Sequence, residues 1–228
     1  MSLPVGGCGR TPSNWSRKRA MDWHAVEARI LSEIDRKIGE HSLSPAEYEI
    51  VRRIIAETAD FDYLSALYFS ERALQAGAAA LAARSTIVVD VPTIQVGVAP
   101  HLQQTFANPI YCAADTLTRR HQEKIGQPIA AGMRKLSQRY PEGIFVVGRD
   151  SMALTVLLKA IASESIRPAL VICTLPTFVN VKDLKKQLCE LLIPTICTLS
   201  SKGGRLVAGA ILSGLIDLAW QAYRQDAG

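Results

Sequence analysis

The chain has 228 residues, of which 48% are hydrophobic, and this size and composition are typical of one α/β domain with a large core. Its formal net charge is +5, but the basic residues are scattered and aromatic residues make up only 6%, which argues against nucleic acid and fits an anionic small molecule. The longest apolar stretch, 206–216, is shorter than the roughly 20 residues of a membrane-spanning helix, so we expect no membrane contact.

The first 20 residues and the cysteines bear on location. Residues 1–20 contain glycine, proline, serine and a basic run, but no apolar segment of the secretory kind. We predict a disordered arm there, followed by a single α/β domain over 21–228. The five cysteines are odd in number and have no CxxC spacing, which favours neither a disulfide framework nor a zinc site. We therefore expect a cytoplasmic protein without a bound metal.

The first predicted elements are helices. A helix is predicted over 24–37 because apolar residues recur there at helical spacing. Residues 44–47, SPAE, form a capping-box sequence with proline at the first helical position. The second helix therefore begins there, and we expect it to end near Thr58. An alanine-rich helix is predicted next, over 70–84.

From residue 86 onward, short apolar strands alternate with helices. This pattern is typical of a parallel sheet that is covered on both faces. We therefore predict an α/β fold with a doubly wound, mainly parallel sheet of about five strands flanked by helices. The predicted strands are 86–89, 110–113, 144–147, 169–173 and 195–199, and the helices among them are 129–139, 151–162, 181–191 and 204–223.

The loops that follow these strands should carry the function, because ligands of open α/β sheets bind beyond the carboxyl ends of the strands. These loops are 90–97, 148–151, 174–180 and 200–204. In the last of them, two glycines before a helix would let the backbone approach an anionic ligand, or they would simply form a tight turn. No metalloprotease, α/β-hydrolase or P-loop motif is present, which leaves those classes without support.

Five separate segments carry a recognisable pattern: RRIIAETADFDY (52–63), VVDVPTIQVGV (88–98), GRDSMAL (148–154), FVNVKDLKKQL (178–188) and SKGG (201–204). In this order they resemble the precorrin-8X methylmutase family of cobalamin (vitamin B12) biosynthesis. The resemblance covers residues 24–219 and implies a homodimeric, cytoplasmic α/β protein with no cofactor. It also implies methyl migration between adjacent ring carbons of a corrin precursor, an acidic tetrapyrrole that would suit the basic charge.

The resemblance also implies which residues form the site. Ala56 occupies the position of the family's acid–base histidine, so no catalytic residue is identified in this sequence. His24 is a weak substitute by position, and Glu57 is a weaker one. Pro128 stands where the family has a substrate-holding arginine. The residues assigned to substrate binding are Thr58, Asp90, Gly148, Arg149, Phe178, Lys185, Lys202, Gly203 and Gly204.

Other positions of the expected ligand-facing rim also depart from the family pattern, which indicates a rebuilt pocket. They are Pro128, Arg149, Thr177, Asn180 and Arg205. For two of the loops a structural role competes with a binding role, since Asp150 or Ser151 suits a helix N-cap. Three functions therefore remain open: methyl migration, non-catalytic binding of a corrinoid or other tetrapyrrole, and a regulatory relative without a tetrapyrrole site.

Overall fold

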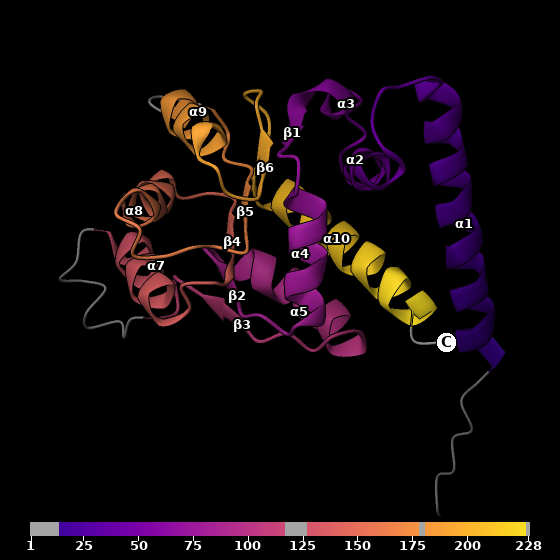
Figure 1. The fold of residues 1–228 in the computed structure, drawn as a ribbon. Coiled ribbons are helices and arrows are strands. Elements are labelled where there is room, and N and C mark those ends of the chain that lie inside the picture. Colours follow the sequence, from indigo (N-terminus) through magenta and orange to yellow (C-terminus); the bar gives the residue numbers. More distant parts are fainter. Residues whose placement is uncertain (1–13, 117–126, 178–180, 227–228) are drawn as a thin grey trace, which may run out of the picture. The chain divides into compact units, whose positions relative to one another are not determined.

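The computed structural model describes residues 14–116, 127–177 and 181–226 (Figure 1). The chain divides into two compact units, 1–41 and 42–228, so the predicted boundary at residue 20 falls inside the first unit. Phe178 and His121 lie outside the described residues, as does most of the arm predicted over 1–20.

The first unit contains helix α1 (Asn14–Ile38), which begins well before the predicted start at residue 24. The expected arm is therefore corrected for residues 14–20, which are helical and include the helix-favouring residues arginine, lysine and alanine. The helix ends at Gly39, whose φ of +66° is available to glycine without strain, and the Gly39 amide donates to the Asp35 carbonyl at 3.1 Å.

The second unit is built on a six-stranded sheet with the order β1-β6-β5-β4-β2-β3. All neighbours are parallel except β1, which runs antiparallel to β6. The predicted α/β fold and the five parallel strands are confirmed, and β1 is an addition at one edge. The strands are β1 (Leu67–Phe69), β2 (Ile87–Val89), β3 (Ile110–Cys112), β4 (Ile144–Val147), β5 (Leu170–Cys173) and β6 (Thr195–Thr198).

Helices cover both faces of this sheet, as the doubly wound prediction requires (Figure 1). One layer consists of α10 with α2, α4 and α5, each of which packs on α10, and the other consists of α7, α8 and α9. The short helix α3 leads into β1. The helices are α2 (Pro45–Thr58), α3 (Tyr63–Ala66), α4 (Ala73–Ala82), α5 (Pro92–Gln104), α7 (Pro128–Arg139), α8 (Ser151–Ala162), α9 (Val181–Glu190) and α10 (Arg205–Asp226).

Helix α2 forms as its sequence predicts. The Ser44 amide donates to the Glu47 carboxylate at 2.8 Å, and the Ser44 hydroxyl accepts from the Glu47 amide at 3.4 Å, which completes the capping box. The helix ends where Ala59 takes a left-handed conformation with φ 54°. Ile50, Ile54 and Ile55 are buried on its inner face.

Helix α5 was not predicted from the sequence. Its segment contains several β-branched residues together with Gly97 and Pro100, all of which lower helix propensity. Ile94, Val98 and Leu102 nevertheless recur four residues apart and are buried against the rest of the layer. Tertiary burial therefore stabilises a helix that local preference disfavours.

Helix α10 is the only helix in the described ranges long and apolar enough to cross a membrane, judged by length and composition. Half of its apolar window is buried in the protein, and the helix packs against α2, α4 and α5, as a core helix of the layer does.

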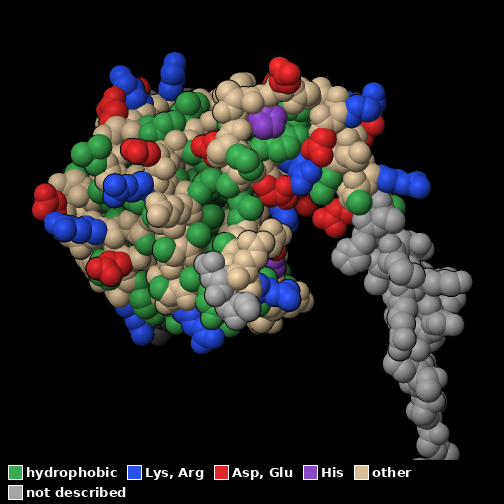
Figure 2. All heavy atoms as spheres, turned by 45° about the vertical axis from the view of Figure 1, so that its right-hand side comes forward, with side chains coloured by type: hydrophobic (Ala, Val, Ile, Leu, Met, Phe, Trp, Pro, Cys, Tyr) green, Lys and Arg blue, Asp and Glu red, His purple; other side chains and the backbone are tan. Residues whose placement is uncertain are grey.

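Figure 2 shows acidic and basic side chains interspersed on the visible face rather than gathered in one basic patch. This distribution agrees with the scattered charge in the sequence.

Candidate functional site

A cavity of about 560 Å³ lies where β4 and β5 end, at the predicted ligand edge of the sheet. It brings together three residues assigned to substrate binding, Gly148, Arg149 and Gly204. Among its other lining residues is Arg205, the first residue of α10. We call this space the loop cavity. Its lining is Gly148, Arg149, Ser151, Leu175, Pro176, Val181, Gly204 and Arg205.

The Asp90 carboxylate organises one wall of the loop cavity from behind. It is fully buried, and its Oδ2 accepts from the amides of Gly148 at 3.1 Å, Arg149 at 2.7 Å and Asp150 at 2.9 Å. Burial raises the pKa of this carboxyl, while the three N–H donors act in the opposite direction. Asp90 therefore fixes the loop after β4 and does not line the cavity.

Asp150 begins helix α8 from the same loop. Its Oδ1 accepts from the Ala153 amide at 2.7 Å, which is the N-cap contact predicted from the sequence. Because the Arg149 backbone is held by Asp90, the exposed Arg149 side chain is presented from a fixed point on the rim.

Lys185 is buried, with only 3% of the residue exposed, and its contacts are internal. The ammonium donates to Thr177 Oγ1 at 2.9 Å, Thr198 Oγ1 at 3.1 Å and the Ser200 carbonyl at 3.2 Å. Burial lowers the pKa of this lysine. Its three hydrogen bonds join the loop after β5 to the end of β6, and Lys185 is not part of the loop cavity's lining.

The glycine pair before α10 is required by a close backbone approach. Gly203 has φ +151°, and a Cβ at this position would lie 2.2 Å from the Thr174 carbonyl oxygen. The Gly204 amide donates to that same carbonyl, and Thr174 Oγ1 donates to the Gly204 carbonyl at 2.9 Å. Of the two glycines, Gly204 is part of the loop cavity's lining, and Gly203 makes the close backbone contact with Thr174.

Lys202 and Thr58 hold the segment that follows α2. The Lys202 ammonium lies 2.6 Å from the carboxylates of both Asp60 and Asp62, and these hydrogen bonds raise its pKa to about 12. The Thr58 hydroxyl donates to the Ile54 carbonyl at 2.7 Å at the end of the helix. Two of the segments that carry the family resemblance, at 52–63 and 201–204, are therefore joined by ion pairs.

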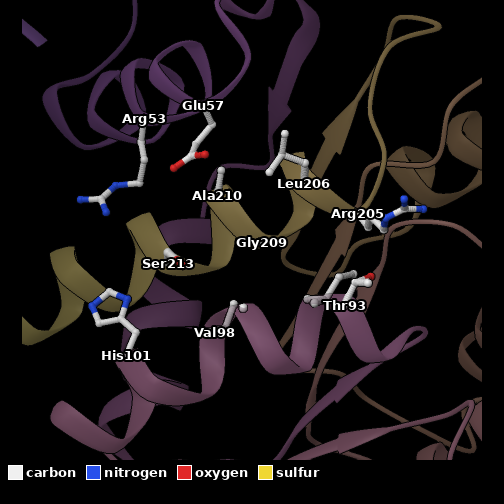
Figure 3. Close-up of a pocket in the computed structure, with 12 residues that line it drawn as sticks. Arg53, Glu57, Thr93, Val98, His101, Arg205, Leu206, Gly209, Ala210 and Ser213 are labelled. Atoms are coloured by element: carbon white, nitrogen blue, oxygen red, sulfur yellow. The ribbon is translucent and has the colours of Figure 1, made fainter. Parts of the chain in front are cut away.

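A second cavity, of about 470 Å³, lies among α2, α5 and α10, and we call it the helix cavity (Figure 3). Arg205 lines both this cavity and the loop cavity. In Figure 3, Arg53 and Glu57 point from α2 toward α10, while His101 points toward α10 from α5. Its lining is Arg53, Glu57, Thr93, Ile94, Gly97, Val98, His101, Arg205, Leu206, Gly209, Ala210 and Ser213.

An ion-paired group forms one end of the helix cavity. Asp217 of α10 accepts from Arg53 Nη2 through Oδ2 at 2.6 Å and contacts His101 Nε2 through Oδ1 at 2.5 Å. The three side chains are 25 to 29% exposed. Sequence analysis missed this group because its members come from three helices, one of which was not predicted.

The remaining candidates occupy other places. Ala56 is exposed on α2 and is not part of either cavity's lining, although the adjacent Glu57 is. His24 belongs to α1, in the other unit, and Pro128 is the first residue of α7. Across the described ranges, no group of three or more histidine, cysteine, aspartate or glutamate residues is arranged to hold a metal ion.

Comparisons with known proteins agree across sequence and structure. The sequence profile of the precorrin-8X methylmutase family matches residues 25–218. The chain is 37% identical over 212 residues to the cobalt-precorrin-8 methylmutase of a Synechocystis species, with 87% of this chain and 97% of the relative covered. The corresponding enzyme of Leptospira interrogans is 32% identical, with 85% and 93% covered.

A crystal structure of precorrin-8X methyl mutase from Thermus thermophilus superposes with a TM-score of 0.81 at 33% identity, and covers 87% of this chain and 97% of its own. A structure described as a precorrin-8X methylmutase related protein gives a TM-score of 0.71 at 21% identity, covering 82% of this chain and 99% of its own, and supports the fold alone.

Proposed function

We propose that this chain, which belongs to the precorrin-8X methylmutase family, moves a methyl group between adjacent ring carbons of a corrin precursor in cobalamin biosynthesis. The observation that carries this proposal is the loop cavity at the edge of the sheet where α/β proteins bind ligands, together with Arg205, which lines this cavity and the helix cavity as well. A broad ring system would extend from the loop cavity into the helix cavity.

The charges of the lining suit an acidic tetrapyrrole. Arg149 and Arg205 project from the rim, and within the described part of the chain neither forms an ion pair. A guanidinium holds a carboxylate through two parallel hydrogen bonds, which gives orientation as well as affinity. These two arginines would fix the acidic side chains of the precursor and so set the position of the ring.

The reaction needs no net oxidant or reductant, because a methyl group only changes its carbon. Holding the ring in one reactive geometry contributes to such a rate independently of proton transfer. We accordingly expect no cofactor. The protein is further proposed to act in the cytoplasm as a homodimer, in which the exposed apolar side chains of Met152, Leu199 and Leu206 near the ligand edge would be covered.

Titration of the purified protein with the corrin precursor tests this function. The absorbance spectrum reports binding, and NMR of the recovered ring reports whether a methyl group has moved at constant mass. Arg205→Gln should weaken binding about 10-fold or more. The matched control is Arg167→Gln, which changes an arginine that is 82% exposed and pairs only loosely with Glu164, at 3.8 Å. Equal affinities for the two variants would contradict the assigned ligand contact.

The second candidate function is non-catalytic binding of a corrinoid or another tetrapyrrole. It is favoured by the methyl side chain of Ala56, which supplies no acid–base group at that position of α2. The same titration separates the two functions. Tight binding without any isomerised product supports the binding protein, whereas conversion at a steady rate supports the enzyme.

A further inference from the structure

We propose that His101 is the acid–base residue of the helix cavity and that Asp217 is the residue that orients it. This inference deepens the proposed methyl migration and rests on it. It assigns a chemical role to a histidine that belongs to none of the sequence segments carrying the family resemblance.

The contacts of Asp217 determine how the imidazole is used. An ionised carboxylate only accepts hydrogen bonds, so the 2.5 Å contact requires Nε2 of His101 to carry a hydrogen and donate it. The other carboxylate oxygen accepts from Arg53 at 2.6 Å. Asp217 therefore fixes both the orientation and the tautomer of His101, in the way that a buried aspartate does for a catalytic histidine.

The second ring nitrogen remains for a ligand. Among the described residues, none forms a hydrogen bond with Nδ1 of His101. The ring lines the cavity and is 25% exposed, so a molecule in that space can reach it. Figure 3 shows His101 and the Glu57 carboxylate on opposite sides of the cavity, both directed toward α10.

The charged groups around the ring are few and can be named. Asp217 of α10 contacts the ring, and Arg53 of α2 pairs with the same carboxylate and lies 3.9 Å from Glu49. Glu57 of α2 lines the same cavity, and α5 itself contains no other ionisable residue. A purely structural partner for Asp217 would need only a permanent positive charge. Histidine differs because it gains and loses a proton near neutral pH, which is the property a general acid–base group requires.

The proton transfer balances without another reactant. Protonated His101 donates the Nδ1 proton to the conjugated ring system, which leaves the neighbouring ring carbon poor in electrons. The methyl group then moves to that carbon together with its bonding electron pair. The precursor's ring system then returns the proton to Nδ1 of His101, so the product is an isomer of the substrate and the imidazolium is restored.

His101→Gln is the decisive variant, because the Gln amide can still donate to Asp217 but cannot transfer a proton. We expect kcat to fall about 10² to 10⁴-fold, with affinity for the precursor changed less than threefold. The dependence of kcat on pH between about 5 and 8 should flatten as well. His41→Gln, a change of an exposed histidine in the other unit, is the matched control and should retain both the rate and the pH profile.

Two further variants separate the roles of neighbouring groups. Asp217→Asn should lower kcat while His101 stays in place, as expected for an orienting residue. If Glu57→Gln abolishes turnover and His101→Gln does not, the acid–base role belongs to Glu57 and our inference is overturned. Thermal unfolding of each variant distinguishes a chemical loss from a loss of fold.

The outcome also separates this inference from the function on which it rests. An active wild-type protein whose His101→Gln variant is equally active overturns the inference alone. A wild-type protein that binds the precursor but never converts it overturns the proposed function and the inference together.

Discussion

The loop cavity and the helix cavity are framed by different kinds of contact. Around the loop cavity, buried polar groups such as Asp90 and Lys185 make three hydrogen bonds each to neighbouring loops. Around the helix cavity, Arg53, His101 and Asp217 form ion pairs that remain partly exposed. Buried polar groups are costly to leave unpaired, whereas partly exposed ion pairs contribute little to stability.

This difference indicates that several residues in the family-like segments support the structure of the loops. Asp90, Lys185 and Gly203 were assigned to substrate binding, yet each supports the backbone of a ligand-facing loop. The partly exposed residues of the helix cavity can change with less effect on the fold. We therefore expect stability to depend on the first region and the chemistry of the reaction to depend on the second.

The largest stability effect is expected for Gly203→Ala. The new Cβ would lie 2.2 Å from the Thr174 carbonyl oxygen, on a backbone with φ +151°. We expect a loss on the order of 3 kcal/mol in the free energy of unfolding, measured by urea denaturation. Gly209→Ala is the control, since its Cβ would meet nothing within 4 Å, and it should stay within about 1 kcal/mol of wild type. Equal losses of stability in the two variants would contradict the expected difference between the loop cavity and the helix cavity.

Asp90→Asn should have the next largest effect, about 1 to 3 kcal/mol, because the amide group would be buried without an acceptor. The folded-state pKa of Asp90 is raised from its ordinary value of 3.8. The stability that this pKa shift contributes to the folded state is thus fully present below the ordinary pKa of 3.8, and it is lost as pH rises through the raised pKa. The advantage of wild type over the variant should therefore shrink from pH 4 toward neutrality, in unfolding measurements on both proteins.

Asp217→Asn is the matching change in the helix cavity and should have the smallest effect on stability. Its partners are 25 to 29% exposed, so we expect a change of about 1 kcal/mol or less in the free energy of unfolding. Salt at about 1 M should reduce that difference further. A loss as large as that of Asp90→Asn would show that the ion pairs of the helix cavity also support the fold.

Much of the fold could be predicted from local patterns. The capping box placed the start of α2 correctly. The five apolar strands from residue 86 onward were found at nearly the right positions along the chain, and their parallel arrangement was predicted correctly. Strand β1 was missed because it depends on antiparallel pairing with β6, which is distant in the sequence. Helix α5 was missed because its β-branched residues and Pro100 disfavour a helix until Ile94, Val98 and Leu102 are buried.

The candidate site was predicted less completely. The loops at 148–151 and 200–204 were placed correctly because parallel strands end at the same edge of a sheet, and Gly148, Arg149 and Gly204 do meet in one cavity. Their role in binding substrate stays a prediction. The loop predicted over 90–97 was wrong from Pro92 onward, where helix α5 begins. His101 was not selected, because its significance depends on Asp217, which lies 116 positions away in the chain.

By itself, the sequence determined the family, the alternation of strands and helices and the edge where a ligand would bind, because these follow from local propensity, periodicity and motif order. Only the tertiary structure decided which polar residues support loops and which face a cavity. That distinction depends on burial and on distances between side chains from separate helices, and neither is encoded in the local pattern around any one residue.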